Sequence, residues 1–104
     1  MILIELIFDT APEQRESAVA LARRTMDATR QEEGCILYRF NTDLDVPYRF
    51  ILTELWESEE ALTAHFQGNA FKAFWADLPP GGSFVSSTAW QGSLTPYVPP
   101  SPNE

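Results

Sequence analysis

Hydrophobic positions along the chain divide into four short runs with strand character and two longer stretches with helical spacing. The first run, residues 2–8, is rich in β-branched and aromatic residues and is mostly apolar on both faces, which predicts a strand covered on both sides. The stretch that follows, up to about Glu32, predicts a helix. Its apolar face is formed by Ala18, Val19, Ala22, Met26 and Thr29.

Residues at the two ends of this helix carry start and stop signals. Thr10 can cap the helix, Pro12 suits its first turn, and Glu13 stands where a capping box places its carboxylate. Gly34 predicts a left-handed residue that ends the helix.

The second and third strands are expected to form a hairpin. Residues 35–41 alternate, with Ile36, Tyr38 and Phe40 on one face, and the turn-rich residues 42–47 follow. The third strand spans about residues 48–56. Its period of two puts four side chains on one face, namely Phe50, Leu52, Glu54 and Trp56.

Residues 58–91 predict a broken helix followed by a fourth strand. Ser58 can cap the helix, which is expected to break near Gly68 and continue over residues 70–77. Residues 78–82 form a proline- and glycine-rich stop. Residues 84–91 predict a strand with Phe84, Ser86, Thr88 and Trp90 on one face.

The order of elements is β-α-β-β-α-β, which predicts an α+β fold of ferredoxin-like type with a four-stranded antiparallel sheet. The helices cover one face of this sheet, and the other face carries apolar residues such as Ile51, Leu55 and Val85. A second copy packed on that face would bury them, so a homodimer is expected. We assign residues 1–92 to this domain. Residues 93–104 form a proline-rich tail, extended and laid on a partner subunit or disordered near its end.

Charge and composition narrow the classes of partner. The formal net charge of −8 repels phosphate backbones, which argues against nucleic-acid binding and docking on anionic membranes. A single cysteine, Cys35, excludes an intrachain disulfide and fits a reducing cytoplasm. The first residues lack the pattern of a signal peptide, and no apolar run reaches the length of a membrane span.

His65, the single histidine, is the first candidate for chemistry, because an imidazole titrates near pKa ~6.5 and can act as a base at neutral pH. The alternative is a histidine that packs against Phe66. Trp56 is placed equally well as a core residue and as a wall for a flat ligand. Glu54 lies among apolar residues and needs a partner, for which Arg39 and Arg49 are the candidates.

Three further aromatic residues, Tyr38, Phe71 and Phe74, are interpreted as core residues that could also touch a ligand. The sequence offers no catalytic triad, no glycine-rich phosphate loop and no cluster of metal ligands. No cofactor and no metal are therefore predicted.

Several residues recur at characteristic spacings: Glu33-Gly-Cys-x-x-Tyr38, then Phe50-x-x-x-Glu54-x-Trp56-Glu-Ser-x-x-Ala61-Leu-x-x-His65, then Phe71-x-x-Phe74. This pattern resembles the antibiotic biosynthesis monooxygenase family. The resemblance extends over nearly the whole chain up to the tail. It implies a dimeric α+β barrel, in which ferredoxin-like subunits pack sheet against sheet, with a pocket between each sheet and its helices.

The resemblance also implies an activity. Family members include cofactor-free oxygenases that act on quinols and polyketide anthrones with O₂, and here Trp56 and His65 would line the pocket as catalytic residues. Phe50, Glu54, Tyr38, Phe71 and Phe74 would then bind the small aromatic substrate. Haem-degrading relatives carry an asparagine on their first strand, which residues 2–8 lack. The competing hypothesis is a non-catalytic dimer that binds a small hydrophobic metabolite.

Overall fold

A computed structural model of the chain describes residues 1–103; Glu104, the last residue of the predicted tail, lies outside the described residues. One antiparallel sheet with the strand order β2-β3-β1-β4 forms the centre of the fold. Its strands are β1 (Ile2–Asp9), β2 (Cys35–Thr42), β3 (Arg49–Trp56) and β4 (Ser83–Gln91).

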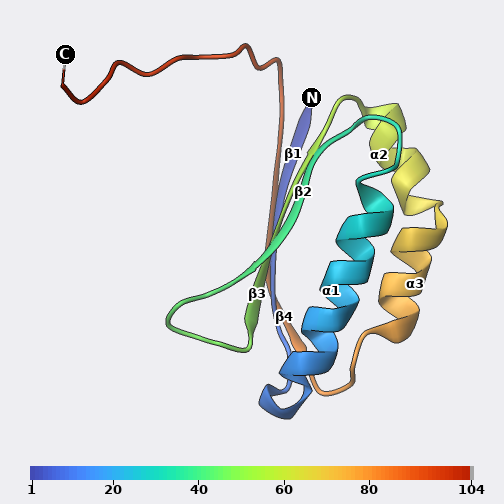
Figure 1. The fold of residues 1–104 in the computed structure, drawn as a ribbon. Helices are drawn as coiled ribbons and strands as arrows, with labels where there is room; N and C mark the ends of the chain where they lie inside the picture. Colours follow the sequence, from blue (N-terminus) through green and yellow to red (C-terminus); the bar gives the residue numbers. More distant parts are fainter. Residues whose placement is uncertain (104) are drawn as a thin grey trace.

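All helices pack on one face of this sheet, and the other face is uncovered in the single chain (Figure 1). They are the 3₁₀ turn η1 (Pro12–Gln14) and the helices α1 (Arg15–Thr29), α2 (Glu59–Phe66) and α3 (Asn69–Asp77). The α+β fold with β-α-β-β-α-β order is thus confirmed, with the second helix in two pieces as expected. Within residues 1–103, no helix combines the length and the apolar character needed to cross a membrane.

The core lies between the helices and the covered face of the sheet. On β3, Phe50, Leu52, Glu54 and Trp56 are all buried, as their spacing predicts. Burial of a large apolar side chain contributes about 1.5–3 kcal/mol, so this strand face is a main source of stability. The same layer contains Phe8, Ala18, Leu21, Ala22, Tyr38, Phe40, Leu62 and Phe74.

The start and the end of the first helix differ from the expectation. Thr10 is not its cap: the Thr10 hydroxyl donates to the carbonyl of Tyr48 at 3.4 Å, and neither η1 nor α1 has a side-chain cap. The helix ends at Thr29 rather than Glu32. Gly34 does adopt a positive φ of 82°, but within the turn that leads into β2. The prediction for Ser58 is confirmed, since its hydroxyl accepts the backbone N–H of Ala61 at 3.1 Å.

A β-bulge at the start of β2 changes which residues face the core. Cys35 pairs with Trp56, and Leu37 pairs with Leu55, the neighbour of Trp56 on β3. Ile36 therefore has no partner on β3 and is the extra residue of the bulge. Ile36 is 53% exposed, and the prediction that it shares a face with Tyr38 and Phe40 is wrong.

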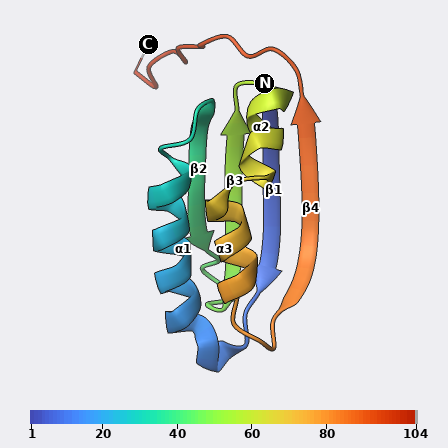
Figure 2. The ribbon, with the colours of Figure 1, turned by 90° about the vertical axis from the view of Figure 1, so that its right-hand side faces the viewer.

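A second bulge lies in β4, opposite Ile7 and Phe8 of β1. It places the four residues predicted to share one face of β4 on two different faces. Trp90, Thr88 and Ser86 pair with residues of the uncovered face, whereas Phe84 pairs with Phe8 and faces the helices. The extra residue in β4 shifts the alternation by one position. The helices do not extend over β4, which forms the edge of the sheet (Figure 2), and all nine of its residues are exposed.

The uncovered face carries apolar side chains from every strand. The pairs Leu3–Leu55, Leu3–Trp90 and Ile7–Ile51 place these residues together, and Leu37 pairs with Leu55. Strand β1 is therefore covered on one side only in the isolated chain, where the sequence predicts cover on both. Beyond Gly92 the described part of the tail, residues 93–103, has no helix or strand and extends toward the uncovered side of the sheet (Figure 1).

Candidate functional site

An apolar cavity of about 280 Å³ lies between β1, β4, α3 and the loop that joins α3 to β4. Aromatic and aliphatic side chains form most of its wall. These are Leu6 and Phe8 from β1, Phe74 and Trp75 from α3, Leu78 and Pro79 from the loop, and Phe84 from β4. A cavity of this kind suits a small apolar or aromatic molecule.

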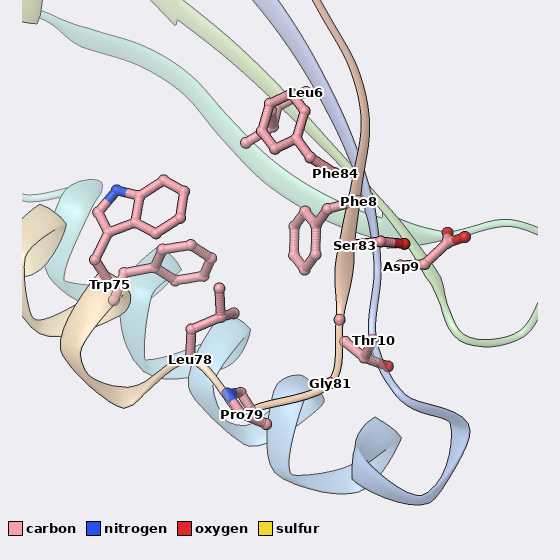
Figure 3. Close-up of a pocket in the computed structure, with 12 residues that line it drawn as sticks. Leu6, Phe8, Asp9, Thr10, Trp75, Leu78, Pro79, Gly81, Ser83 and Phe84 are labelled. Carbon is pink, nitrogen blue, oxygen red and sulfur yellow. The ribbon is translucent and has the colours of Figure 1, made fainter.

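The polar residues at the rim of this cavity are already engaged elsewhere. Figure 3 shows the side chains of Asp9 and Ser83 pointing away from the rings of Phe8 and Trp75. The Asp9 carboxylate accepts two hydrogen bonds from the Arg49 guanidinium, at 2.8 and 3.1 Å. These bonds hold the pKa of Asp9 below its usual range. No titratable side chain among the described lining residues therefore points into the cavity as an available base.

The α3–β4 loop can form a wall of the cavity because two glycines let it approach the end of β1. A Cβ atom on Gly82 would lie 2.6 Å from the carbonyl oxygen of Asp9, and Gly81 has a φ of 86°. Only glycine fits both positions without moving the backbone. The sequence Leu78-Pro-Pro-Gly-Gly thus forms one wall of the cavity as well as ending the helix.

Of the seven residues predicted for the site, Phe74 alone lines this cavity. Phe74 stacks on Phe40, with 5.7 Å between ring centroids, and meets Phe8 edge to face at 6.1 Å. Phe50 stacks on Phe8, with 5.4 Å between ring centroids, and borders a separate groove beside α1. The sequence therefore predicts an aromatic cavity between sheet and helices, but the cavity lies nearer to β4 than expected.

The space around Trp56 and His65, expected to be hollow, is filled by side chains. Trp56 is 0% exposed and His65 3%. The imidazole lies 4.7 Å from the Trp56 ring, 5.7 Å from Tyr38 and 5.5 Å from Phe71, measured between centroids. His65 and Trp56 thus share a packed polar core next to the cavity.

Glu54 does not pair with either predicted arginine. Its Oε1 accepts the indole N–H of Trp56 at 2.9 Å and lies 4.0 Å from Nε2 of His65. Burial raises the pKa of Glu54, and the Trp56 hydrogen bond and the His65 charge oppose that rise. Arg49 is bound by Asp9 instead.

Sequence reasoning missed Glu32, which lies in the turn between α1 and β2. Its Oε1 is 2.6 Å from Nδ1 of His65, the shortest side-chain contact in this cluster. The two residues are 33 positions apart, so no local spacing signals the contact. Two neighbouring titratable groups also have shifted pKa values, because burial raises the pKa of the Cys35 thiol and of the Tyr38 phenol.

Within the described residues, no group of three or more His, Cys, Asp or Glu side chains is placed to hold a metal ion.

The comparison with known families decides the relationship. The model of the family described as antibiotic biosynthesis monooxygenase matches residues 1–77. The chain belongs to this family. The match includes both the polar core around His65 and the α3 residues of the cavity wall.

Two curated relatives are similar to this family member. YcnE of Bacillus subtilis, whose assignment as a monooxygenase is provisional, is 32% identical over 73 residues, which cover 65% of this chain and 77% of YcnE. An uncharacterized protein of Synechocystis is 35% identical over 63 residues, covering 61% of this chain. The aligned region spans only 43% of that protein.

Solved structures show the same fold. A protein of Deinococcus radiodurans, provisionally assigned as an antibiotic biosynthesis monooxygenase, superposes with a TM-score of 0.77 at 24% identity, covering 94% of this chain and 98% of its own. One from Nitrosomonas europaea with the same provisional assignment gives a TM-score of 0.79 at 14% identity, covering 90% and 100%. At these identities the likeness concerns the fold alone.

Proposed function

We propose that this protein is a cofactor-independent monooxygenase that oxidises a quinol, an anthrone or a similar electron-rich aromatic molecule with O₂. The observation that supports it is the apolar, aromatic-walled cavity between the sheet and α3 in a member of this family. Phe8, Phe74 and Trp75 would hold the planar substrate.

The reaction needs no external reductant. When an anthrone methylene becomes a carbonyl, the substrate supplies four electrons, one oxygen atom enters the product and the other leaves as water. Removing a hydroxyl or enol proton makes the ring a better electron donor to O₂, and apolar walls limit the contact of water with the reactive intermediate. The protein's task is to bind, to exclude water and to hold one proton.

His65 is the proton acceptor in this proposal, and Trp56 supports it. Because His65 is 3% exposed and does not line the cavity, the proton must reach it through an intermediate group. The remaining predicted site residues, Tyr38, Glu54, Phe50 and Phe71, surround these two rings and the adjoining core.

A second candidate function is binding of a small hydrophobic metabolite without turnover. The burial of His65 and the ion pair that occupies Asp9 favour it, because a binding protein needs no available base at its cavity.

We further propose that two copies pack through their uncovered sheet faces. Leu3, Ile7, Ile51, Leu55 and Trp90 would be buried there, while the polar residues between them, such as Arg39, Glu5 and Thr53, pair along the same strands. Apolar residues gathered on one sheet face favour association with a like surface.

Oxygen uptake separates the two candidate functions. The purified protein is mixed with a panel of hydroquinones and anthrones, with heat-denatured protein as the control for autoxidation. Uptake above the control, with one equivalent of O₂ per anthrone converted, supports the oxygenase. Saturable quenching of tryptophan fluorescence with no uptake for any compound that binds would instead show a binding protein.

The His65→Gln variant tests the role of the imidazole, and Gln67→Ala, in the turn after the same helix, serves as its control. A positioned base contributes about 10²–10⁴-fold to rate, so His65→Gln should lose turnover within that range. Unchanged turnover in a folded variant would remove His65 from the mechanism.

A further inference from the structure

Three ionisable side chains from separate parts of the chain meet beneath α2. Glu32 comes from the α1–β2 turn, His65 from α2 and Glu54 from β3. The imidazole lies between the two carboxylates, with Nδ1 2.6 Å from Glu32 and Nε2 4.0 Å from Glu54. Each ring nitrogen of His65 therefore faces a carboxylate oxygen.

The three side chains of this row differ in their exposure to solvent. The Glu32 side chain is 25% exposed, whereas the side chains of His65 and Glu54 are 2% and 7% exposed. Glu32 is therefore the member of the row that reaches water.

Glu54 lies at the opposite end of the row and does not itself line the cavity. It pairs with Ile4 of β1, and Leu6, two residues further along β1 on the same face, lines the cavity. Diagonal neighbours on adjacent strands are about 7–8 Å apart, so Glu54 lies directly behind the part of the cavity wall that Leu6 forms. The row thus begins one side chain away from the proposed substrate.

We propose that Glu54, His65 and Glu32 form a proton path for the oxygenase reaction, in which Glu32 is the positioning residue for His65. The inference rests on the proposed function. An ionised Glu32 only accepts hydrogen bonds, so it fixes the hydrogen of the neutral ring on Nδ1 and leaves the Nε2 lone pair directed toward Glu54.

The proton balance closes within one turnover. The O–H bond of the substrate breaks, and the proton passes through a bridging water to Glu54 and on to Nε2 of His65. This leaves a substrate anion and an imidazolium between two carboxylates. O₂ then adds to a carbon atom of the anion, and the same proton returns by the same route to give a hydroperoxide. The remaining C–H bond at this carbon and the O–O bond break together, so a carbonyl forms and the released hydroxide and proton combine as water. The substrate reduces O₂, and no further oxidant or reductant takes part.

Other groups around the row bear on any pH dependence. Tyr38 and Cys35 of β2 face it, and burial raises the pKa of both, so they remain neutral through the neutral range. Arg30 donates to the backbone carbonyl of Tyr38 at 3.0 Å and contributes a positive charge near the Cys35 side. On α3, the neighbour of His65 is the apolar ring of Phe71.

The first test needs no substrate, because His65 is the single histidine of the chain and gives one set of imidazole nitrogen signals. Long-range proton–nitrogen correlation spectra at pH 8 should show the hydrogen on Nδ1 in the wild type and in Glu32→Gln. Glu32→Ala should show both tautomers. Glu33→Gln, which changes the exposed neighbouring carboxylate, is the control and should match the wild type.

The second test uses the substrate found by oxygen uptake. Glu32→Gln keeps an acceptor for Nδ1–H but loses the charge, so kcat should fall at least about 10-fold, and Glu32→Ala should lose about 10². KM should stay within about twofold, because Glu32 does not touch the cavity. Glu32→Asp should restore part of kcat, and Glu33→Gln should leave it unchanged.

These measurements distinguish the two proposals. A Glu32→Ala spectrum identical to that of the wild type would overturn the positioning role, whatever the activity. An unchanged kcat in Glu32→Ala would overturn the proton path. If no compound in the panel is oxidised, the oxygenase proposal fails, while the tautomer spectra still decide whether Glu32 positions His65.

Discussion

The indole N–H of Trp56 donates a 2.9 Å hydrogen bond to the carboxylate of Glu54, two residues earlier on the same face of β3. This contact satisfies the one polar group of a fully buried tryptophan. It also explains how a carboxylate is kept in the core, next to His65 rather than beside an arginine.

Replacing Glu54 by Gln should change how stability depends on pH. Burial raises the pKa of Glu54 above its ordinary value of 4.5, so the folded chain binds this proton more tightly than the unfolded chain does. The stabilisation from this proton is complete below pH 4.5 and is lost as pH rises through the raised pKa. Glu54→Gln removes this pH-dependent loss of stability, and its amide oxygen can still accept the indole N–H of Trp56.

Urea denaturation of both proteins between pH 4 and 8 measures the effect. The stability of Glu54→Gln relative to the wild type should increase with pH across this range. A difference that is constant with pH, or one that decreases, would contradict the assigned direction.

Gly34→Ala should destabilise the fold strongly. Gly34 has a φ of 82°, and a Cβ atom there would collide with the side chain of Ala61 on α2. The left-handed conformation alone costs an alanine about 1–2 kcal/mol, and the collision adds to this. Because the carbonyl of Gly34 also accepts the N–H of Glu57, the loss should loosen α2 together with the turn.

Gly92 provides the matched control, since a Cβ atom at this position meets nothing within 4 Å. Thermal unfolding should show a lower Tm for Gly34→Ala and little change for Gly92→Ala. Equal Tm values for the two variants would mean that Gly34 is not under the constraint described.

Patterning along the chain predicts the fold well because each element has a face that must be buried. The alternation in β3 identifies its four core residues, and Ser58 and the Gly68–Asn69 break define α2 and α3. Periodicity fails where an extra residue enters a strand, because a bulge shifts every later side chain to the other face. Ile36 and Phe84 are on unexpected faces for this reason.

The candidate site is less predictable from sequence than the fold. The family pattern brings Trp56, Glu54 and His65 into one cluster, but whether a cluster is packed or hollow depends on how side chains from distant elements fill the space. Leu6, Leu78 and Phe84 meet around the cavity only through the tertiary arrangement. The contact between Glu32 and His65 is of the same kind.

Phe74→Ala should weaken both the fold and ligand binding. Phe74 is 6% exposed, packs against Phe8 and Phe40, and lines the cavity. Truncating a buried phenylalanine typically costs about 3–5 kcal/mol. Phe66, which is 45% exposed on α2 and does not line the cavity, provides the control.

Urea denaturation and fluorescence titration with a hydroxylated polycyclic aromatic compound check this prediction. Phe66→Ala should lose no more than about 1–2 kcal/mol of stability, since about half of its surface is already in water, and should bind as the wild type does. Phe74→Ala should bind more weakly at a temperature where it remains folded. Unchanged binding would show that the ligand occupies another place.

Removing the tail after Gly92 should weaken the proposed dimer. Gly92 is held to the start of β1 by two hydrogen bonds, in which the Met1 amino group donates to the Gly92 carbonyl at 2.7 Å and the Gly92 N–H donates to the Met1 carbonyl at 3.0 Å. From this anchor the tail runs toward the uncovered side of the sheet (Figure 1). Its apolar side chains Leu94, Tyr97 and Val98 are 56%, 78% and 87% exposed in the single chain. A subunit packed on the sheet face would meet them.

Sedimentation equilibrium of the full chain and of a chain ending at Gly92 tests whether the protein dimerises and whether the tail contributes. The truncation leaves the hydrogen bonds between Gly92 and Met1 in place. We expect a dimer for the full chain and a dissociation constant at least about 10-fold higher for the shorter one, a change of 1.4 kcal/mol or more. Leu94→Ser with Tyr97→Ser in the full chain should reproduce most of that change, whereas Ser101→Ala should not. A monomeric full chain would refute sheet-to-sheet pairing. A dimer of equal strength in both lengths would refute only the contribution of the tail.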